Sequence, residues 1–275
     1  MKYTIQTIKY VLKNFIFLFP FVIVPAFLFA LSIDKVALET LLRAFFSGNF
    51  SGIEFGLIFR SVSFLGFTSG WTVLSGLGGL ATLIVGVSLL LAFTDRHMRI
   101  GKRGYRGVFS KLNVNILTTA CIAVFLLAAY ELFALILSAL LYLAFQFDSV
   151  ALTYIFSAVF FFGMHFVLLC VITLGYLWLP CLQMTGFRVF EALTYSNQLC
   201  QSIKRKILIN QFILLFLSEI LISASLFIPM DNVVPVLVAS VLYVFMMMVF
   251  CVRMQIVYFD RAQIERADLK SYYER

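Results

Sequence analysis

The chain has 275 residues, of which 63% are hydrophobic and only 12% are charged, and it carries a net charge of +8. A soluble globular domain needs roughly a quarter of its residues charged to cover its surface, so this composition excludes one. Lipid has to be the solvent for most of the apolar surface. We therefore expect an all-α, polytopic membrane protein that forms a single membrane domain over residues 1–275.

The N-terminal segment combines a basic start with an apolar run, as a signal peptide does. Pro20 and Pro25 interrupt the run 15–33, and no small-residue cleavage site follows it, so we expect a retained first helix, with a cleaved signal peptide as the alternative.

Residues 2–13 place apolar side chains at helical spacing opposite lysines. This pattern predicts an amphipathic helix on the inner membrane surface, although packing as a cytoplasmic collar fits equally well.

Six apolar runs are long enough to cross a hydrocarbon core of roughly 30 Å, which takes about 20 helical residues. Their ranges are 15–33, 73–93, 116–143, 152–179, 212–228 and 236–257. The third and fourth are longer than a bilayer needs, so they should tilt, kink or project beyond it. Between the first two runs, residues 36–46 predict a short amphipathic helix that ends at Ser47-Gly48-Asn49.

The distribution of basic residues orients these spans. Of the 21 Lys and Arg, 18 lie in the two termini, in the loops 94–112 and 181–210, or at the helix ends next to them. The positive-inside rule then puts both termini in the cytoplasm and arranges the spans as three outward-and-back hairpins. Lys and Asn precede an apolar run in three places, Lys13-Asn14, Lys111–Asn115 and Lys206–Asn210, and the last two share Lys-x-x-x-Asn, which supports the hairpin plan. We expect Lys to anchor at the phosphates and Asn to satisfy backbone groups where a helix enters lipid, with independent use of interfacial Lys and Asn as the alternative. We expect a multi-pass protein of the bacterial cytoplasmic (inner) membrane.

The basic loops are candidate contacts for anionic lipid headgroups, as basic residues beside membrane helices commonly are. The candidates are Arg96, Arg99, Lys102, Arg103, Arg106, Lys204, Arg205 and Lys206. Because topology accounts for the positive charge, we expect the lipid bilayer as the partner, with a membrane protein as a possible second partner and no nucleic acid.

Three ionisable residues, Glu131, His165 and Glu219, lie inside apolar runs, where charged groups are costly and mark candidate functional sites. A rise of about 1.5 Å per residue puts Glu219 near the midplane, His165 in the middle-to-outer region and Glu131 towards the outer leaflet. Glu219 and His165 either share a proton or bind a substrate cation, or each makes an ordinary interhelical hydrogen bond. Arg253, near the inner end of the last run, is expected to extend its charge to the interface.

A C-terminal stretch of about 90 residues resembles a group of uncharacterised bacterial membrane proteins, the YciC-like proteins and the membrane domain attached to some glycerophosphodiester phosphodiesterases. The shared features are Leu179-Pro180, the segment Gly-Phe-Arg-Val-Phe-Glu-Ala-Leu-Thr-Tyr-Ser at 186–196, Lys206, and the ending Tyr258-Phe-Asp260 with Glu265-x-x-Asp268-Leu269. Arg266 stands where these proteins usually have Gly, and the spacing is one residue shorter. The resemblance implies a six-helix membrane protein and carries over no catalytic residue.

The sequence contains no Ser-His-Asp set, phosphate-binding loop or paired-carboxylate motif, and its five Cys lack metal-ligand spacing. We therefore predict no enzyme activity, catalytic residue, metal or cofactor. The expected function is envelope organisation, or lipid or partner-protein binding, through the basic cytoplasmic face. The alternative is a small transporter or permease component that uses Glu131, His165 and Glu219.

Overall fold

The computed structural model describes residues 2–228 and 233–269, with the side chains of 111–115 left outside this description, and these residues contain helices and no β-strand. Six helical segments are long and apolar enough to cross a membrane. They are α2 (Phe15–Ser32), α5 (Gly70–Ile100), α6 (Leu112–Ala144), α7 (Val150–Leu174) continued by α8 (Trp178–Thr185), α10 (Lys204–Ser225) and α11 (Val233–Arg261). The prediction of an all-α protein with six membrane-spanning segments is confirmed at this level.

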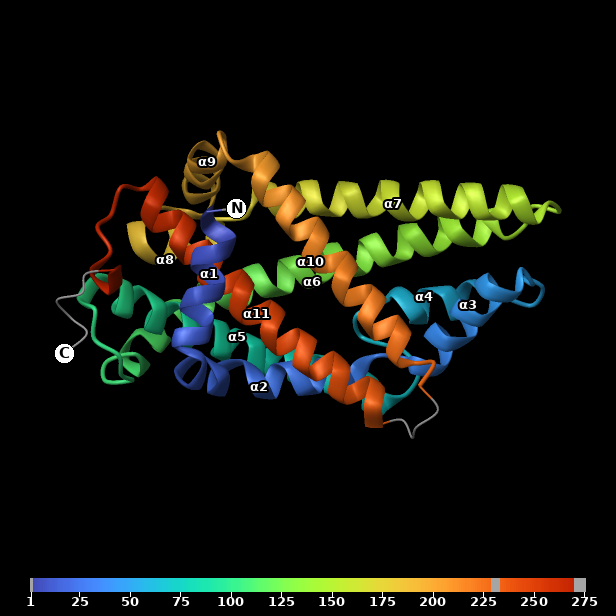
Figure 1. Cartoon of the computed structure of the whole chain (residues 1–275), viewed down its shortest axis with the longest axis horizontal. Coiled ribbons are helices and arrows are strands. Elements are labelled where there is room, and N and C mark those ends of the chain that lie inside the picture. The colour runs from blue at the N-terminus through green and yellow to red at the C-terminus, as the bar shows by residue number, and fades with distance from the viewer. Residues whose placement is uncertain (1, 229–232, 270–275) are drawn as a thin grey trace.

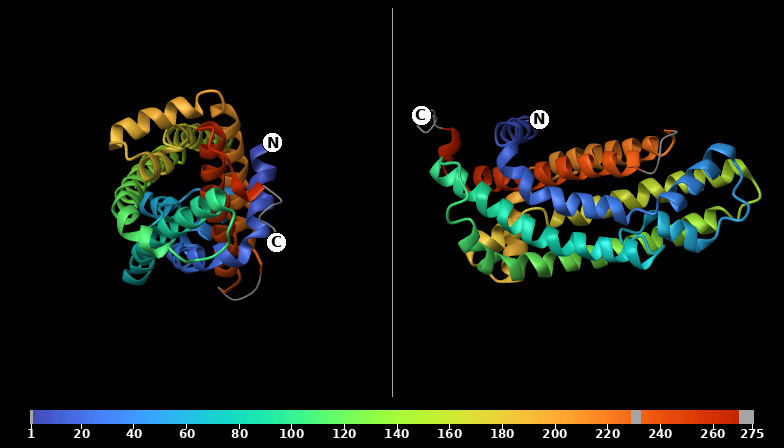
Figure 2. Two further views of the ribbon diagram at one scale, coloured as in Figure 1. Left: turned by 90° about the vertical axis from the view of Figure 1, so that its left-hand side faces the viewer. Right: turned by 90° about the horizontal axis from the view of Figure 1, so that it is seen from below.

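The long helices run lengthwise through the molecule, and the short helices gather at its two ends (Figures 1 and 2). One end carries α3 (Lys35–Ser47), α4 (Phe55–Val62) and the turn between α6 and α7. The other end carries α1 (Lys2–Lys13), α8, α9 (Val189–Cys200) and the short 3-10 turns at Phe109–Lys111 and Ala267–Leu269. The two ends therefore differ in structure as they do in charge, while the side of the membrane that each faces stays a prediction.

Consecutive long helices contact each other: α2 packs along α5, α6 against α7, and α10 against α11. These are the contacts that three hairpins require, and α2 also packs along α11. The α2–α5 contact is close because it uses glycines on α5. A Cβ at Gly86 would lie 2.1 Å from the carbonyl oxygen of Phe21, and one at Gly79 would lie 2.5 Å from the Phe29 ring. Small residues allow such backbone approach in lipid, where packing drives helix association.

The largest differences from the predicted spans are at three helix boundaries. Helix α5 continues to Ile100, seven residues past the predicted end at 93. The range 152–179 is interrupted, because α7 ends at Leu174 and a turn through Gly175 precedes α8. Helix α10 begins at Lys204, eight residues before the predicted span, because the basic residues at its start are helical and were interpreted as loop. Helical propensity of Lys and Arg explains this, since both are good helix formers.

The short helix predicted over 36–46 is confirmed as α3, and its ends have clear causes. The Asp34 carboxylate accepts a hydrogen bond from the Ala37 backbone N–H at 3.0 Å, which caps the start of α3. At the other end Gly48 adopts a left-handed conformation with φ of 69°, which glycine tolerates without strain.

The predicted role of the interfacial asparagines is visible in two of the three places. Asn210 donates from Nδ2 to the Lys206 carbonyl at 2.7 Å, and Asn14 donates to the Tyr10 carbonyl at 2.9 Å. Each amide thus satisfies a backbone carbonyl near a helix boundary, as the sequence interpretation required. The third instance, the Lys111 and Asn115 side chains, lies outside the described residues.

Candidate functional site

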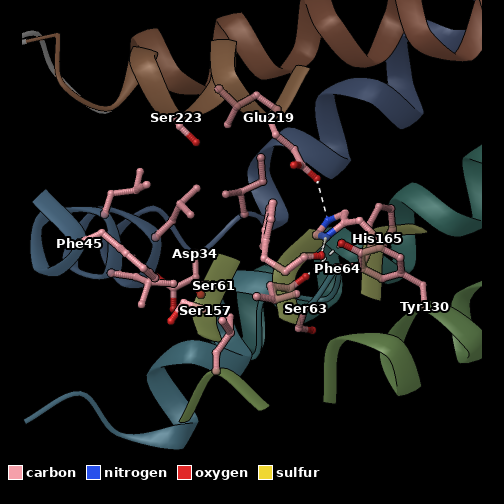
Figure 3. A pocket seen from close by; sticks show the side chains of 18 of the residues that line it. Asp34, Phe45, Ser61, Ser63, Phe64, Tyr130, Ser157, His165, Glu219 and Ser223 are labelled. Atoms are coloured by element: carbon pink, nitrogen blue, oxygen red, sulfur yellow. Dashed lines mark hydrogen bonds and ion pairs between the residues drawn. The ribbon is translucent and has the colours of Figure 1, made fainter. Parts of the chain in front are cut away.

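A cavity of about 510 Å³ lies between α6, α7, α10, α11 and the segment that leads from α2 through α3 and α4 to α5. Figure 3 shows side chains from these elements pointing into it. Most of its wall is apolar or aromatic, and a few polar groups converge on it, which is the usual composition of a small-molecule site. Its volume also falls within the range of such sites, roughly 300–1,000 Å³.

His165 on α7 and Glu219 on α10 meet at this cavity, as Figure 3 shows. The His165 Nε2 atom lies 3.2 Å from Glu219 Oε1. The His165 side chain is 6% exposed, whereas the Glu219 side chain keeps 35% of its area accessible. The two residues that the sequence proposed as a pair are therefore in contact, with histidine as the buried member and glutamate as the accessible one.

The hydrogen bond on the other side of the imidazole fixes its tautomer. His165 Nδ1 lies 2.8 Å from the backbone carbonyl oxygen of Phe161. A carbonyl oxygen only accepts hydrogen bonds, so Nδ1 is protonated and donates. In a neutral ring with this tautomer, Nε2 is a bare acceptor facing a carboxylate oxygen of Glu219, and two acceptors at that distance repel each other.

A proton between Nε2 and Oε1 is therefore required for the 3.2 Å contact. That proton resides on His165, giving an imidazolium and a carboxylate, or on Glu219, giving a neutral ring and a carboxylic acid. Both forms have zero net charge, which suits a partly buried site where an unpaired charge is costly. The geometry thus defines a site that holds one proton shared by two helices.

Aromatic rings surround the imidazole. The ring centroids of Phe161, Phe133 and Phe216 lie 4.1, 5.2 and 5.6 Å from that of His165. The rings come from α7, α6 and α10, so His165 sits where three helices converge. This packing restricts the imidazole to the orientation that presents Nε2 to Glu219.

Glu131, the third predicted residue, does not line the cavity. Its carboxylate instead accepts three hydrogen bonds from the segment before α5, from the Ser63 hydroxyl at 2.8 Å and from the backbone N–H groups of Phe64 and Leu65 at 3.1 Å each. The neighbouring Tyr130 hydroxyl donates to the Val62 carbonyl at 3.1 Å. Glu131 therefore holds in place the loop that forms part of the cavity wall, which is a structural role.

Further polar residues line the cavity and were not singled out by the sequence interpretation, among them Asp34 and Ser157. Asp34 lies between α2 and α3, where Thr68 donates to its carboxylate and Arg60 Nε lies 3.9 Å from it. The Ser157 hydroxyl on α7 is buried and has no hydrogen-bond partner among the described residues. Because buried hydroxyls are normally bonded, this oxygen is available to a ligand. A lone Ser in an apolar run gives no signal in sequence.

The predicted lipid-contact residues fall into two groups. Arg99 pairs with Asp95 at 2.6 Å and its guanidinium lies over the Phe259 ring, while Arg96 and Lys204 are only partly exposed. Besides Arg99, the exposed members are Lys102, Arg103, Arg106, Arg205 and Lys206, which extend from the loop after α5 and the start of α10. This exposed group is the part of the prediction that remains suited to lipid headgroups.

Arg253 differs from its sequence prediction. The residue is only 6% exposed, and its Nε has no hydrogen-bond partner among the described residues. Its surroundings are the main hydrophobic cluster, next to Tyr176, so the side chain does not extend to the interface. Helices α1, α2 and α8 pack against α11. They cover the Arg253 side chain, which an isolated helix would leave exposed.

Comparisons with protein-family models, with curated proteins and with solved structures find no match to this chain. Among the described residues, no group of three or more His, Cys, Asp and Glu is arranged to hold a metal ion. The class of the protein follows from its structure alone. Six helices long and apolar enough to cross a membrane, together with the cavity, define a polytopic helical membrane protein with an internal cavity.

The three bonds to Glu131 predict its effect on stability. Replacing Glu131 by Ala leaves two backbone N–H groups and one hydroxyl without their acceptor, which should cost roughly 3 kcal/mol and lower the melting temperature by roughly 6–12 °C. Glu131→Gln keeps one acceptor oxygen and should cost about half as much. Thermal unfolding of the detergent-solubilised protein measures both. Glu54→Ala is the control, because Glu54 is exposed at the same end of the molecule and makes no capping bond; equal effects of the Glu131 and Glu54 changes would refute the structural role.

Proposed function

We propose that the protein is a non-enzymatic component of a bacterial cytoplasmic membrane that binds a small amphipathic ligand in the His165–Glu219 cavity, as a transporter or permease component does. The observation that carries this proposal is a shared-proton pair on the wall of a ligand-sized cavity. Purely structural polar groups in lipid are expected to be packed against protein on all sides. Glu219 instead keeps accessible surface and faces the cavity.

The proposed orientation has both termini in the cytoplasm and the hairpin turns outside. The asymmetry of 18 basic residues on one side against three on the other supports it. In this orientation the cavity occupies the outer half of the bundle, because it is lined by the last turn of α2 and by α3. A ligand would enter from the outer leaflet or the outer solution. The resemblance to the YciC-like proteins is compatible with this proposal and stays a prediction.

Cysteine accessibility tests whether the cavity is open to water and ligand. Ala158 lines the cavity, whereas Val159, the next residue along α7, is 59% exposed and does not line it. In a variant lacking the five native Cys, Ala158→Cys should react with a charged methanethiosulfonate on the order of tenfold faster than Val159→Cys, because the reactive thiolate forms where water reaches the sulfur. The two positions lie at nearly the same depth, so bilayer depth does not account for a difference. Equal rates at both positions would count against an open cavity.

A second candidate function, lipid binding on the basic face, is favoured by the shape of α1. The Tyr10 hydroxyl is hydrogen-bonded to His97 Nδ1 at 2.7 Å and Tyr3 donates to Asp260 at 2.5 Å, so one face of α1 is fixed to α5 and α11. Burial raises the pKa of Tyr10 well above its usual value, which keeps the phenol protonated as a donor. A second face exposes Ile5, Ile8 and Leu12, and a third exposes Lys2, Lys9 and Lys13. An apolar stripe beside a lysine stripe suits a helix in the headgroup region of an anionic leaflet.

Anionic-lipid binding can be measured by native mass spectrometry of protein purified with phosphatidylglycerol. Each basic residue near the surface contributes about 1 kcal/mol, so changing Lys204, Arg205 and Lys206 together to Gln should weaken binding on the order of 100-fold. Arg43→Gln, at the opposite end of the molecule, should leave it unchanged. Retained lipid in the triple variant would remove this candidate function.

A further inference from the structure

Resting on the proposed ligand-binding function, we infer that the cavity takes a lipophilic organic cation, an ammonium or phosphonium group carried on an apolar body. The first observation is the sign of the charge on its wall. Two carboxylates, Asp34 and Glu219, line it, and no Lys or Arg is present among its described lining residues. A low-dielectric wall that carries two carboxylates and one histidine, and no Lys or Arg among its described residues, favours cations over anions.

The two carboxylates are not equivalent. Asp34 is nearly fully buried, its oxygens are occupied by Ala37 and Thr68, and Arg60 lies 3.9 Å away to balance its charge. Among the described residues, Glu219 makes one ion-pair contact, to His165, and its side chain remains accessible. The carboxylate that can face a ligand is therefore Glu219, and the unpartnered Ser157 hydroxyl lines the same cavity.

The aromatic lining supplies the second observation. Seven of the lining side chains are aromatic, including Phe64, Tyr130 and Tyr243. Aromatic faces attract cations through the ring quadrupole, most strongly where water is displaced, and groups of them are a recognised binding surface for quaternary ammonium. A lining that combines aromatic faces with one accessible carboxylate complements a charge that is spread over a bulky apolar group.

The shared proton provides the third observation. While the proton bridges His165 and Glu219, the pair is neutral. A ligand cation placed beside Glu219 takes the place of that proton, which is released to water; the carboxylate then pairs with the cation in place of Nε2, and His165 remains neutral with Nδ1–H donated to Phe161. The exchange conserves the charge of the site, because one positive charge replaces another next to the same carboxylate. Neither an anion nor a neutral ligand can make this replacement.

Two ions of nearly the same shape and opposite charge test the inference. Tetraphenylphosphonium, tetraphenylborate and the neutral triphenylphosphine oxide are titrated into full-length protein in phosphatidylcholine nanodiscs, with empty nanodiscs subtracted. Saturable binding is expected for the phosphonium and none for the borate. Glu219→Gln should weaken phosphonium binding on the order of tenfold or more, since one full charge interaction is lost. Asp34→Asn, on the same wall, should weaken it less, because Arg60 already balances that carboxylate.

Two cavity variants separate the possible failures. Ala158→Phe fills the cavity and should abolish phosphonium binding, whereas Val159→Phe faces away and should not; the melting temperature of each variant shows that it is folded. If the neutral oxide binds as tightly as the phosphonium and Ala158→Phe removes both, the cation inference is overturned while the cavity remains a ligand site. If no probe binds and Ala158→Cys reacts no faster than Val159→Cys, both the inference and the proposed function are overturned. Unchanged phosphonium binding in folded Glu219→Gln also overturns the inference.

Discussion

Polar groups that enter a lipid-embedded helix bundle have to find their partners inside the protein, because hydrocarbon offers none. Around the cavity that constraint is met by two carboxylates with different tasks. Glu131 accepts three hydrogen bonds and fixes the loop before α5. Glu219 contacts His165 at the cavity and shares a proton with it. The Glu131 carboxylate holds the loop that forms part of the cavity wall, and the Glu219 carboxylate is the group that can interact with a ligand.

The sequence was sufficient for the class of fold and for part of the site. Composition and run length predicted six apolar helices, and the short helix α3 followed from the amphipathic pattern of 36–46 and its Ser47-Gly48-Asn49 ending. The helix boundaries were less predictable, because a charged start such as Lys204–Lys206 continues a helix without any apolar signal. The break at Gly175 was missed for a related reason, since the surrounding run is apolar throughout.

Depth along a helix can be estimated from sequence, but the direction in which a side chain points around the helix cannot. Glu219 was expected near the midplane and His165 in the middle-to-outer region, and their contact depends on how α7 and α10 rotate to face each other. Glu131 was grouped with them as an ionisable residue inside an apolar run, and the structure turns it towards the loop at Ser63 instead. Arg253 illustrates the same limit, because tertiary packing covers a position that a single helix would leave open. The unpartnered Ser157 and the aromatic lining exist only once the helices are assembled.

The shared proton is the central claim, and ¹⁵N NMR of histidine-labelled protein tests it most directly, because the chain has only two histidines and His165→Asn assigns the signals. The account predicts a His165 ring protonated at Nδ1, with a proton bridging Nε2 to a carboxyl oxygen, and a change in the Nε2 signal in Glu219→Gln while His97 stays the same. A His165 ring that is protonated only at Nε2, or an Nε2 signal unaffected by Glu219→Gln, would contradict it.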